Sequence, residues 1–171
     1  MTTIPVVEAK PVADSRSVLA HWMGVTDANG AGSIHGGTIM KLVDEAAGLA
    51  AMKYARRRVV TVSMDRMDFL VPISVGELVT FRACVNAAWR TSMEVGVRVE
   101  AERPINGEAR HTNTAYLTMV ALDDHGRPTP VPPPEAVSDE ERRRLAQAEL
   151  RRGNRLAERE QMLAHRTHPG G

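Results

Sequence analysis

Residues 37–54 read GTIMKLVDEAAGLAAMKY and give the strongest helix signal in the chain. Apolar side chains would occupy almost every side of this helix, which is typical of a helix buried inside a fold. Three polar residues, Lys41, Asp44 and Glu45, share one face because they are three and four positions apart. A carboxylate on such an apolar helix needs a partner or a chemical task, so Asp44 is the most informative single residue.

Sequence that flanks this helix alternates apolar and polar residues with a period of two, which predicts half-buried strands. Turn signals between the later runs are short, so neighbouring strands are expected to be antiparallel. One strand, one buried helix and then four antiparallel strands imply an α+β fold in which a sheet wraps around the helix. This arrangement is the hotdog fold. The expected strands lie near residues 17–25, 60–65, 79–86, 92–100 and 109–122.

Composition changes along the chain divide it into four expected regions. The stretch GRPTPVPPP has five prolines in nine positions and must be extended. The residues after it are charged and helical, and Ser138 with Glu141 matches a capping box. No wide apolar stripe follows, so this tail is expected to be solvated or loosely docked. The regions are a flexible N-terminal arm (1–15), a hotdog domain (16–125), a Pro-rich linker (126–134) and a charged helical tail (135–171).

The overall composition excludes several classes of protein. The 171 residues carry a net charge of +1, which argues against a general electrostatic grip on nucleic acid. No apolar run approaches the ~18 residues of a membrane span, and the first residues lack a signal-peptide pattern, so a cytoplasmic protein with no membrane partner is expected. The lone Cys84 excludes a disulfide within the chain and is expected to be a buried thiol.

Residues 29–47, NGAGSIHGGTIMKLVDEAA, resemble the signature of the hotdog acyl-CoA thioesterases of the acyl-CoA hydrolase family, brain-type and bacterial YciA-like. Residues 60–65, 69–77 and 90–95 continue the likeness in the same order. Trp89 departs from the family pattern, which usually has Gly at this position. The resemblance implies hydrolysis of fatty acyl-CoA to free acid and CoA.

Elementary chemistry agrees with this resemblance at the start of the helix. The first N–H groups of a helix lack internal partners and carry the positive end of its dipole. Gly36 and Gly37 would let a thioester carbonyl approach these groups, and the N–H of Gly37 would hold its oxyanion. His35 either donates a further hydrogen bond or shapes the loop.

The resemblance assigns the remaining site residues. Asp44 acts as general base or as nucleophile, against the alternative of a structural pair with Lys41. Asn29 orients water or substrate, although an Asn before Gly is also a common turn residue. Substrate-binding roles are expected for Thr61, Arg90, Thr91 and Ser92. No metal or cofactor is expected, since CoA is part of the substrate and product, and the family pairs its units into dimers and often hexamers, each site shared between two chains.

Other functions of hotdog-fold proteins are the alternatives to hydrolysis. Hydratases need an Asp-x-Asn-Pro-x-His motif, and dehydratases need a His-Phe-Pro-Gly loop; neither occurs here. A non-catalytic acyl-CoA sensor of the same fold is the alternative function, although no DNA-binding module precedes residue 17.

Overall fold

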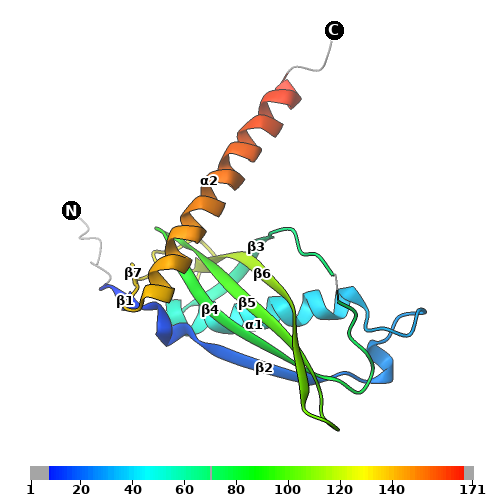
Figure 1. The fold of residues 1–171 in the computed structure, drawn as a ribbon. Coiled ribbons are helices and arrows are strands. Elements are labelled where there is room, and N and C mark those ends of the chain that lie inside the picture. Colours follow the sequence, from blue (N-terminus) through cyan, green and yellow to red (C-terminus); the bar gives the residue numbers. More distant parts are fainter. Residues whose placement is uncertain (1–7, 70, 168–171) are drawn as a thin grey trace, which may run out of the picture.

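A five-stranded antiparallel sheet curls around the long helix α1 (Figure 1). The computed structural model describes residues 8–69 and 71–167, and the strand order in the sheet is β2-β4-β5-β6-β3. The expected hotdog architecture is therefore confirmed. The elements are β1 (Lys10–Pro11), the 3-10 helix η1 (Val12–Ser15), β2 (Ser17–Trp22), the 3-10 helix η2 (Val25–Asp27), α1 (Gly36–Ala55), β3 (Arg58–Met64), β4 (Leu78–Ala88), β5 (Ser92–Arg103), β6 (Glu108–Leu122), β7 (Pro134–Glu135) and α2 (Asp139–Thr167).

The core lies between α1 and the concave face of the sheet. Alternate residues of β4 and β5 point into it, as the period of two predicts. Cys84 also proves to be a buried thiol, although it points to the opposite side, where it contacts Val12 and Ser15. The inward-facing residues of the two strands are Val79, Phe81, Ala83, Val85, Met93, Val95, Val97 and Val99, all fully or almost fully buried.

One side of α1 has no sheet against it, so the expectation of a helix buried all round is wrong for this side. Met40, Leu49 and Met52 are each about two-fifths exposed. Val60 and Val62 of β3 are 43% and 62% exposed, although their period-two pattern indicated a half-buried strand. The physical reason for the open side of α1 is that a single sheet covers only one side of a helix. Val60 and Val62 are exposed because they belong to an edge strand and lie on its outer side, away from α1.

The N-terminal segment also differs from the expected loose arm. Residues 1–7 lie outside the described residues, but Lys10 and Pro11 pair with Pro134 and Glu135 in a small parallel sheet. Val12 and Ser15 of η1 are buried, and the hydroxyl of Ser15 accepts a hydrogen bond from the N–H of Val85. This part of the chain is therefore packed against the sheet.

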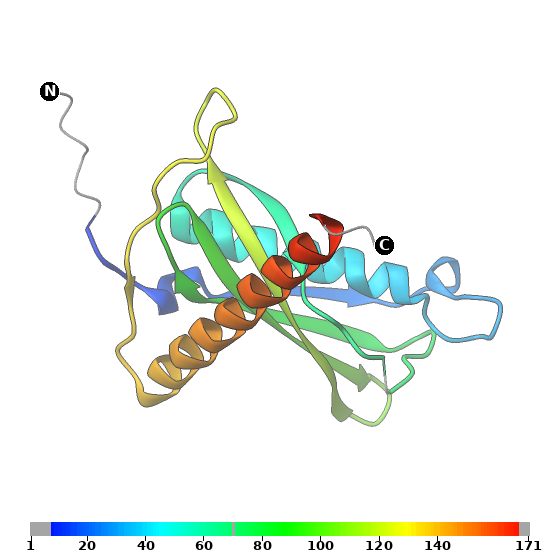
Figure 2. The same ribbon diagram turned by 90° about the horizontal axis from the view of Figure 1, so that it is seen from above.

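Helix α2 crosses the outer face of the sheet, opposite α1, and then extends beyond the body (Figures 1 and 2). Its capping box is present, because the N–H of Ser138 donates to Glu141 and the N–H of Glu141 donates to the Ser138 hydroxyl. Residues 126–133 before it contain no helix, as expected from their prolines. Ala148 is completely buried, so the first half of α2 is firmly docked and the expectation of a loose tail is wrong for it.

Candidate active site

The first turn of α1 is capped by the side chain of the residue before it, His35. His35 is the N-cap residue, and its Nδ1 accepts a hydrogen bond of 3.0 Å from the N–H of Gly37. The donor expected to hold an oxyanion is thus occupied by the imidazole ring. Gly36 is covered instead by the ring of Phe69, which lies 3.7 Å from the place where a Cβ on Gly36 would be.

Asn29 forms a tight turn in the loop before α1. Its Oδ1 accepts from the N–H of Ala31 at 2.9 Å, and its Nδ2 donates to the hydroxyl of Ser33 at 3.1 Å. The backbone of the same turn is closed by a hydrogen bond from the Asn29 N–H to the Ser33 carbonyl. Within one chain, Asn29 therefore acts as a turn residue and does not contact Asp44.

Asp44 projects from the half-exposed side of α1 toward β3. The hydroxyl of Thr61 donates to Asp44 Oδ1 at 2.5 Å, and the same hydroxyl lies 3.3 Å from Met119 Sδ on β6. Lys41 pairs with Glu45 across one helical turn, at 3.6 Å. The neighbouring cation Lys41 is thus engaged with Glu45, and the side chain of Asp44 is oriented by the neutral hydroxyl of Thr61.

The two halves of the expected site are separated along α1. Asp44 is seven residues after Gly37, which places it about 10 Å further along the helix axis. A catalytic group must approach its reacting atom to ~3 Å. The chain therefore brings Asp44 and Thr61 together, brings His35 and Gly37 together, and keeps the two pairs apart.

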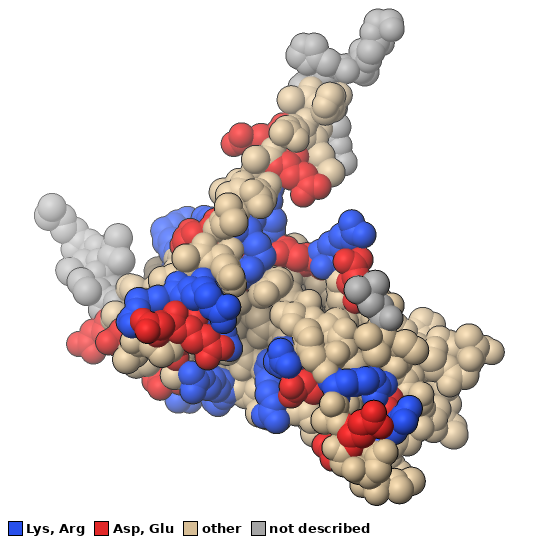
Figure 3. Space-filling model, viewed as in Figure 1, with Lys and Arg blue, Asp and Glu red and all other residues tan. Residues whose placement is uncertain are grey.

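A groove of about 1030 Å³ lies outside the sheet, between the exposed length of α2 and the ends of β3, β5 and β6. Thr91 and Ser92, for which substrate-binding roles are expected, are among the residues that line it. Arg90 does not line it; its carbonyl accepts from the N–H of Val131. Lys and Arg side chains gather where α2 meets the body (Figure 3).

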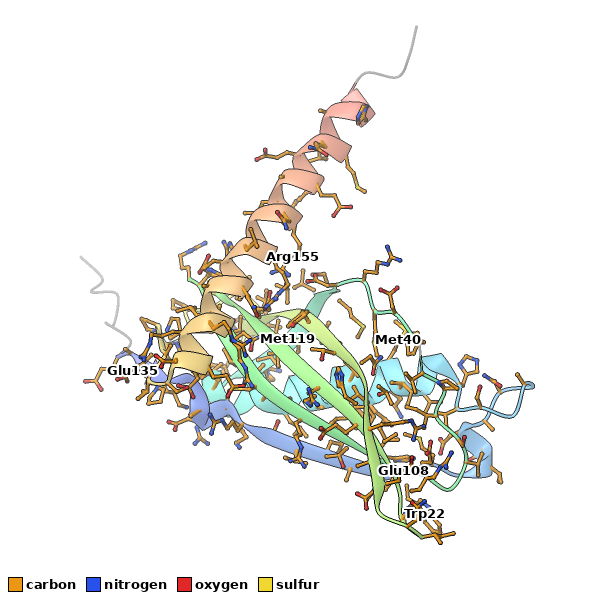
Figure 4. The ribbon with its side chains drawn as sticks, viewed as in Figure 1. Trp22, Met40, Glu108, Met119, Glu135 and Arg155 are labelled. Atoms are coloured by element: carbon orange, nitrogen blue, oxygen red, sulfur yellow. The ribbon has the colours of Figure 1, made fainter. Side chains whose placement is uncertain are left out.

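A buried ion network fastens α2 over this region, and the sequence analysis missed it. Glu94 on β5 is completely buried and pairs with Arg151 at 2.6 Å and Arg155 at 3.0 Å. Arg155 points from α2 toward the body (Figure 4) and also pairs with Asp65 at 2.7 Å. The guanidinium of Arg151 lies 3.6 Å from the centre of the Tyr116 ring. The spacing of arginines along α2 was the available signal, because positions four apart share a helix face.

A second carboxylate organises the loop that supports the start of α1. Glu77 is almost fully buried and receives two bonds from Arg110, at 2.6 and 2.8 Å. These bonds, and one from the N–H of Ser74, hold the pKa of Glu77 below its usual value even though burial acts in the opposite direction. In the same loop, the carbonyl of Ile73 accepts from the N–H of Ile34, next to His35.

Residues 8–69 and 71–167, which the structure describes, contain neither of two other kinds of site. No helix in this part of the chain is long and apolar enough to cross a membrane. No group of three or more His, Cys, Asp or Glu side chains there is arranged to hold a metal ion.

Comparisons with known proteins bear on this geometry. Residues 31–107 match the family model described as thioesterase superfamily. Protein VdlD of Helicobacter pylori is 40% identical over 133 residues, which is 77% of this chain and 76% of that protein. A solved hexameric acyl-CoA thioesterase is 39% identical with a TM-score of 0.85, over 89% of this chain and 97% of that one. The chain belongs to the acyl-CoA hydrolase family of hotdog-fold thioesterases.

Two further members of the family add detail. The cytosolic acyl coenzyme A thioester hydrolase of Mus musculus is 33% identical over 86% of this chain, which spans only 40% of that protein. An acyl-CoA hydrolase from Staphylococcus aureus, solved with butyryl coenzyme A, is 34% identical with a TM-score of 0.82, over 93% of this chain and 99% of that one.

The Staphylococcus aureus hydrolase has also been solved with alanine in place of an asparagine, an aspartate or a threonine. These three positions are separated by 15 and 17 residues. Asn29, Asp44 and Thr61 have the same two separations in this chain.

Proposed function

We propose that this chain hydrolyses fatty acyl-CoA, with water, to a free acid and CoA. The observation that carries the proposal is the carboxylate of Asp44, oriented by the Thr61 hydroxyl at 2.5 Å on the open side of α1. The matching separations of the three altered residues in the Staphylococcus aureus hydrolase support it. CoA is part of the substrate and product, and the reaction needs no metal or cofactor.

In the proposed reaction, Asp44 either takes a proton from water or attacks the carbonyl carbon itself. On the base route the activated water adds to the carbonyl carbon, the carbon–sulfur bond breaks, and the CoA thiolate leaves and takes up the proton from Asp44. On the nucleophile route the thiolate leaves in the same way and takes a proton from water, and water then hydrolyses the acyl–Asp44 anhydride, which releases the free acid and restores the carboxylate. The carbonyl oxygen is held by the N–H groups at the start of α1, with Gly37 leaving room for it and the ring of Phe69 moving aside to open Gly36. For the Gly37 N–H to take part, the ring of His35 must turn away from it, because that N–H now donates to Nδ1.

The site requires two chains in this proposal. Gly37 and Asp44 are about 10 Å apart along one helix, so a two-fold dimer with antiparallel α1 helices would bring Asp44 of one chain to Gly37 and Asn29 of the other. The exposed Met40, Leu49 and Met52 on the open side of α1 support this contact. Assembly of three dimers into a hexamer is supported by the hexameric relative, and a cytoplasmic location is supported by the relative called cytosolic.

A non-catalytic acyl-CoA-binding protein is the second candidate, and one assay separates the two. We expect the full chain to release free thiol from medium-chain acyl-CoA, detected with a thiol reagent. Asp44→Asn should lower kcat by about 10²–10⁴-fold, the range for loss of a general base, while CoA still binds. CoA binding without thiol release by the wild-type chain would favour the sensor, and an Asp44→Asn variant with kcat within a few-fold of wild type would remove Asp44 from the mechanism.

A further inference from the structure

The groove outside the sheet contains two guanidinium groups that form no ion pair with a carboxylate of the described residues. Arg151 and Arg155 are committed to the buried carboxylate of Glu94. Arg152 and Arg159 also face the groove. Among the residues that the structure describes, neither has a carboxylate within ion-pair distance, although Asp65 and Glu158 also line the groove. Two unpaired cations in one concave site are suited to a ligand that carries more than one phosphate.

Trp89 holds Arg152 in place. The guanidinium of Arg152 lies 4.2 Å from the centre of the Trp89 ring, and the Trp89 Nε1 donates to Glu149 at 2.8 Å. The indole is thus fixed between two residues of α2, and it fixes the Arg152 cation at the edge of the groove. A glycine at this position would provide neither contact.

The groove is close to Asp44 in spite of lying on the other side of the sheet. Thr61 points to Asp44 from inside the sheet, and the next residue, Val62, lines the groove outside. β3 is the edge strand of this chain, so a ligand has only to pass that edge. The arm of CoA between its sulfur and its diphosphate has about twelve bonds in line, equal to about four residues of extended chain or ~13 Å.

On this geometry, and given the proposed function, we propose that the groove binds the nucleotide half of CoA, with Arg152 and Arg159 contacting its phosphates. The two arginines are seven residues apart, two turns along one face of α2 and about 10 Å between Cα atoms. Their long side chains can converge on the diphosphate and the 3′-phosphate of one ligand. Thr91 and Ser92 offer hydroxyl groups at the opposite wall.

The test uses adenosine 3′,5′-bisphosphate, which has two phosphates of the proposed ligand but no thioester. The full wild-type chain is expected to bind it in calorimetry and to be inhibited by it in competition with acyl-CoA. Arg159→Gln and Arg152→Gln should each weaken binding about tenfold, the loss typical of one charge-assisted hydrogen bond. Each should raise KM for acyl-CoA by a similar factor and change kcat less than twofold, which a general loss of structure would not do.

Arg143→Gln is the matched control, because Arg143 is an exposed arginine of α2 that does not line the groove. Arg159 is exposed as well, so Arg159→Gln should unfold at the wild-type temperature. The inference is overturned if the wild-type chain does not bind the bisphosphate, for example because a second copy of the chain fills the groove. The inference is also overturned if Arg152→Gln and Arg159→Gln both bind the bisphosphate with an affinity within twofold of wild type. If binding of the bisphosphate depends on these arginines but the wild-type chain releases no thiol from acyl-CoA, the nucleotide-binding groove is supported and the proposed hydrolysis is rejected.

Discussion

At the scale of single residues, Asp44 and Thr61 form the part of the candidate site that one chain completes. The 2.5 Å bond from the Thr61 hydroxyl aims one oxygen of the carboxylate and leaves the other for water or substrate. A hydroxyl hydrogen-bonded in this way fixes the orientation of the carboxylate. Thr61 is therefore expected to act through Asp44.

Thr61→Val removes this hydroxyl with almost no change in volume, and we expect it to lower kcat about tenfold, since one charge-assisted hydrogen bond is worth about 1.5–3 kcal/mol. Thr61→Ser keeps the hydroxyl and is the matched control, with kcat expected within about threefold of wild type. Thiol release under saturating acyl-CoA gives both values. A valine variant as fast as the wild-type chain would show that Thr61 does not position Asp44.

The residues of the site illustrate what a single sequence can and cannot reveal. The apolar helix and the later alternating strands were predictable, because periods of 3.6 and 2.0 are local properties of the chain. The contact between Thr61 and Asp44 is not local, since it depends on how β3 curls over α1. The hydrogen bond from the Gly37 N–H to the His35 ring joins residues two positions apart, but it was not predictable either, because it depends on the side-chain rotamer of His35.

At the scale of elements, α2 docks on the sheet without the wide apolar stripe that usually indicates docking. The helix is held mainly by arginines that contact a buried carboxylate and an aromatic ring. Nothing in the local pattern of β5 distinguishes Glu94 from an ordinary solvent-facing residue. Long cationic side chains bury their stems while keeping their charge paired, so composition alone understates their packing.

Glu94→Gln tests this docking. The change removes the charge that Arg151 and Arg155 share, and we expect it to destabilise the chain by about 2 kcal/mol, in line with loss of hydrogen bonds to charged groups. For a chain of this length such a loss lowers Tm by about 4–8 °C. Glu160→Gln, at an exposed position of the same helix, is the control and should leave Tm unchanged. An unchanged Tm for Glu94→Gln in calorimetry would mean that the network contributes nothing to stability.

The loop between β3 and β4 offers a pH-dependent test. The Arg110 bonds lower the pKa of Glu77 in the folded chain, so the ionised form is favoured by folding. Its contribution to stability is therefore present above the ordinary Glu pKa of about 4.3 and is lost as the pH falls through the lower, folded value. Glu77→Gln should cost about 1–3 kcal/mol at pH 7 in urea unfolding, and this difference should shrink below about pH 4.

Glu108→Gln is the control for that experiment, because Glu108 is well exposed and its pair with Arg103 is long, at 3.5 Å. It should change stability by less than about 0.5 kcal/mol at either pH. If Glu77→Gln were equally destabilising at pH 7 and at low pH, the effect would come from packing and not from the ionised carboxylate.

At the scale of the whole molecule, the open side of α1 and the edge strand β3 are two unfinished surfaces of one chain. The first carries exposed methionine and leucine side chains, and the second leaves backbone groups without a neighbouring strand. Both lie beside Asp44. A partner chain that covers them would also complete the site, which gives the proposed dimer a chemical reason in addition to a packing one.

Subunit mixing tests this shared site. Asn29→Ala and Asp44→Ala are each expected to inactivate every site when made alone. In a mixed dimer with shared sites, one site carries both changes and the other carries neither. Random pairing from equal co-expression makes about half of the dimers mixed, so activity should return to ~25% of wild type. If Asn29 and Asp44 instead serve one site within a single chain, every site stays damaged and activity remains near zero, an outcome that, with mixing confirmed by mass, rejects the shared site.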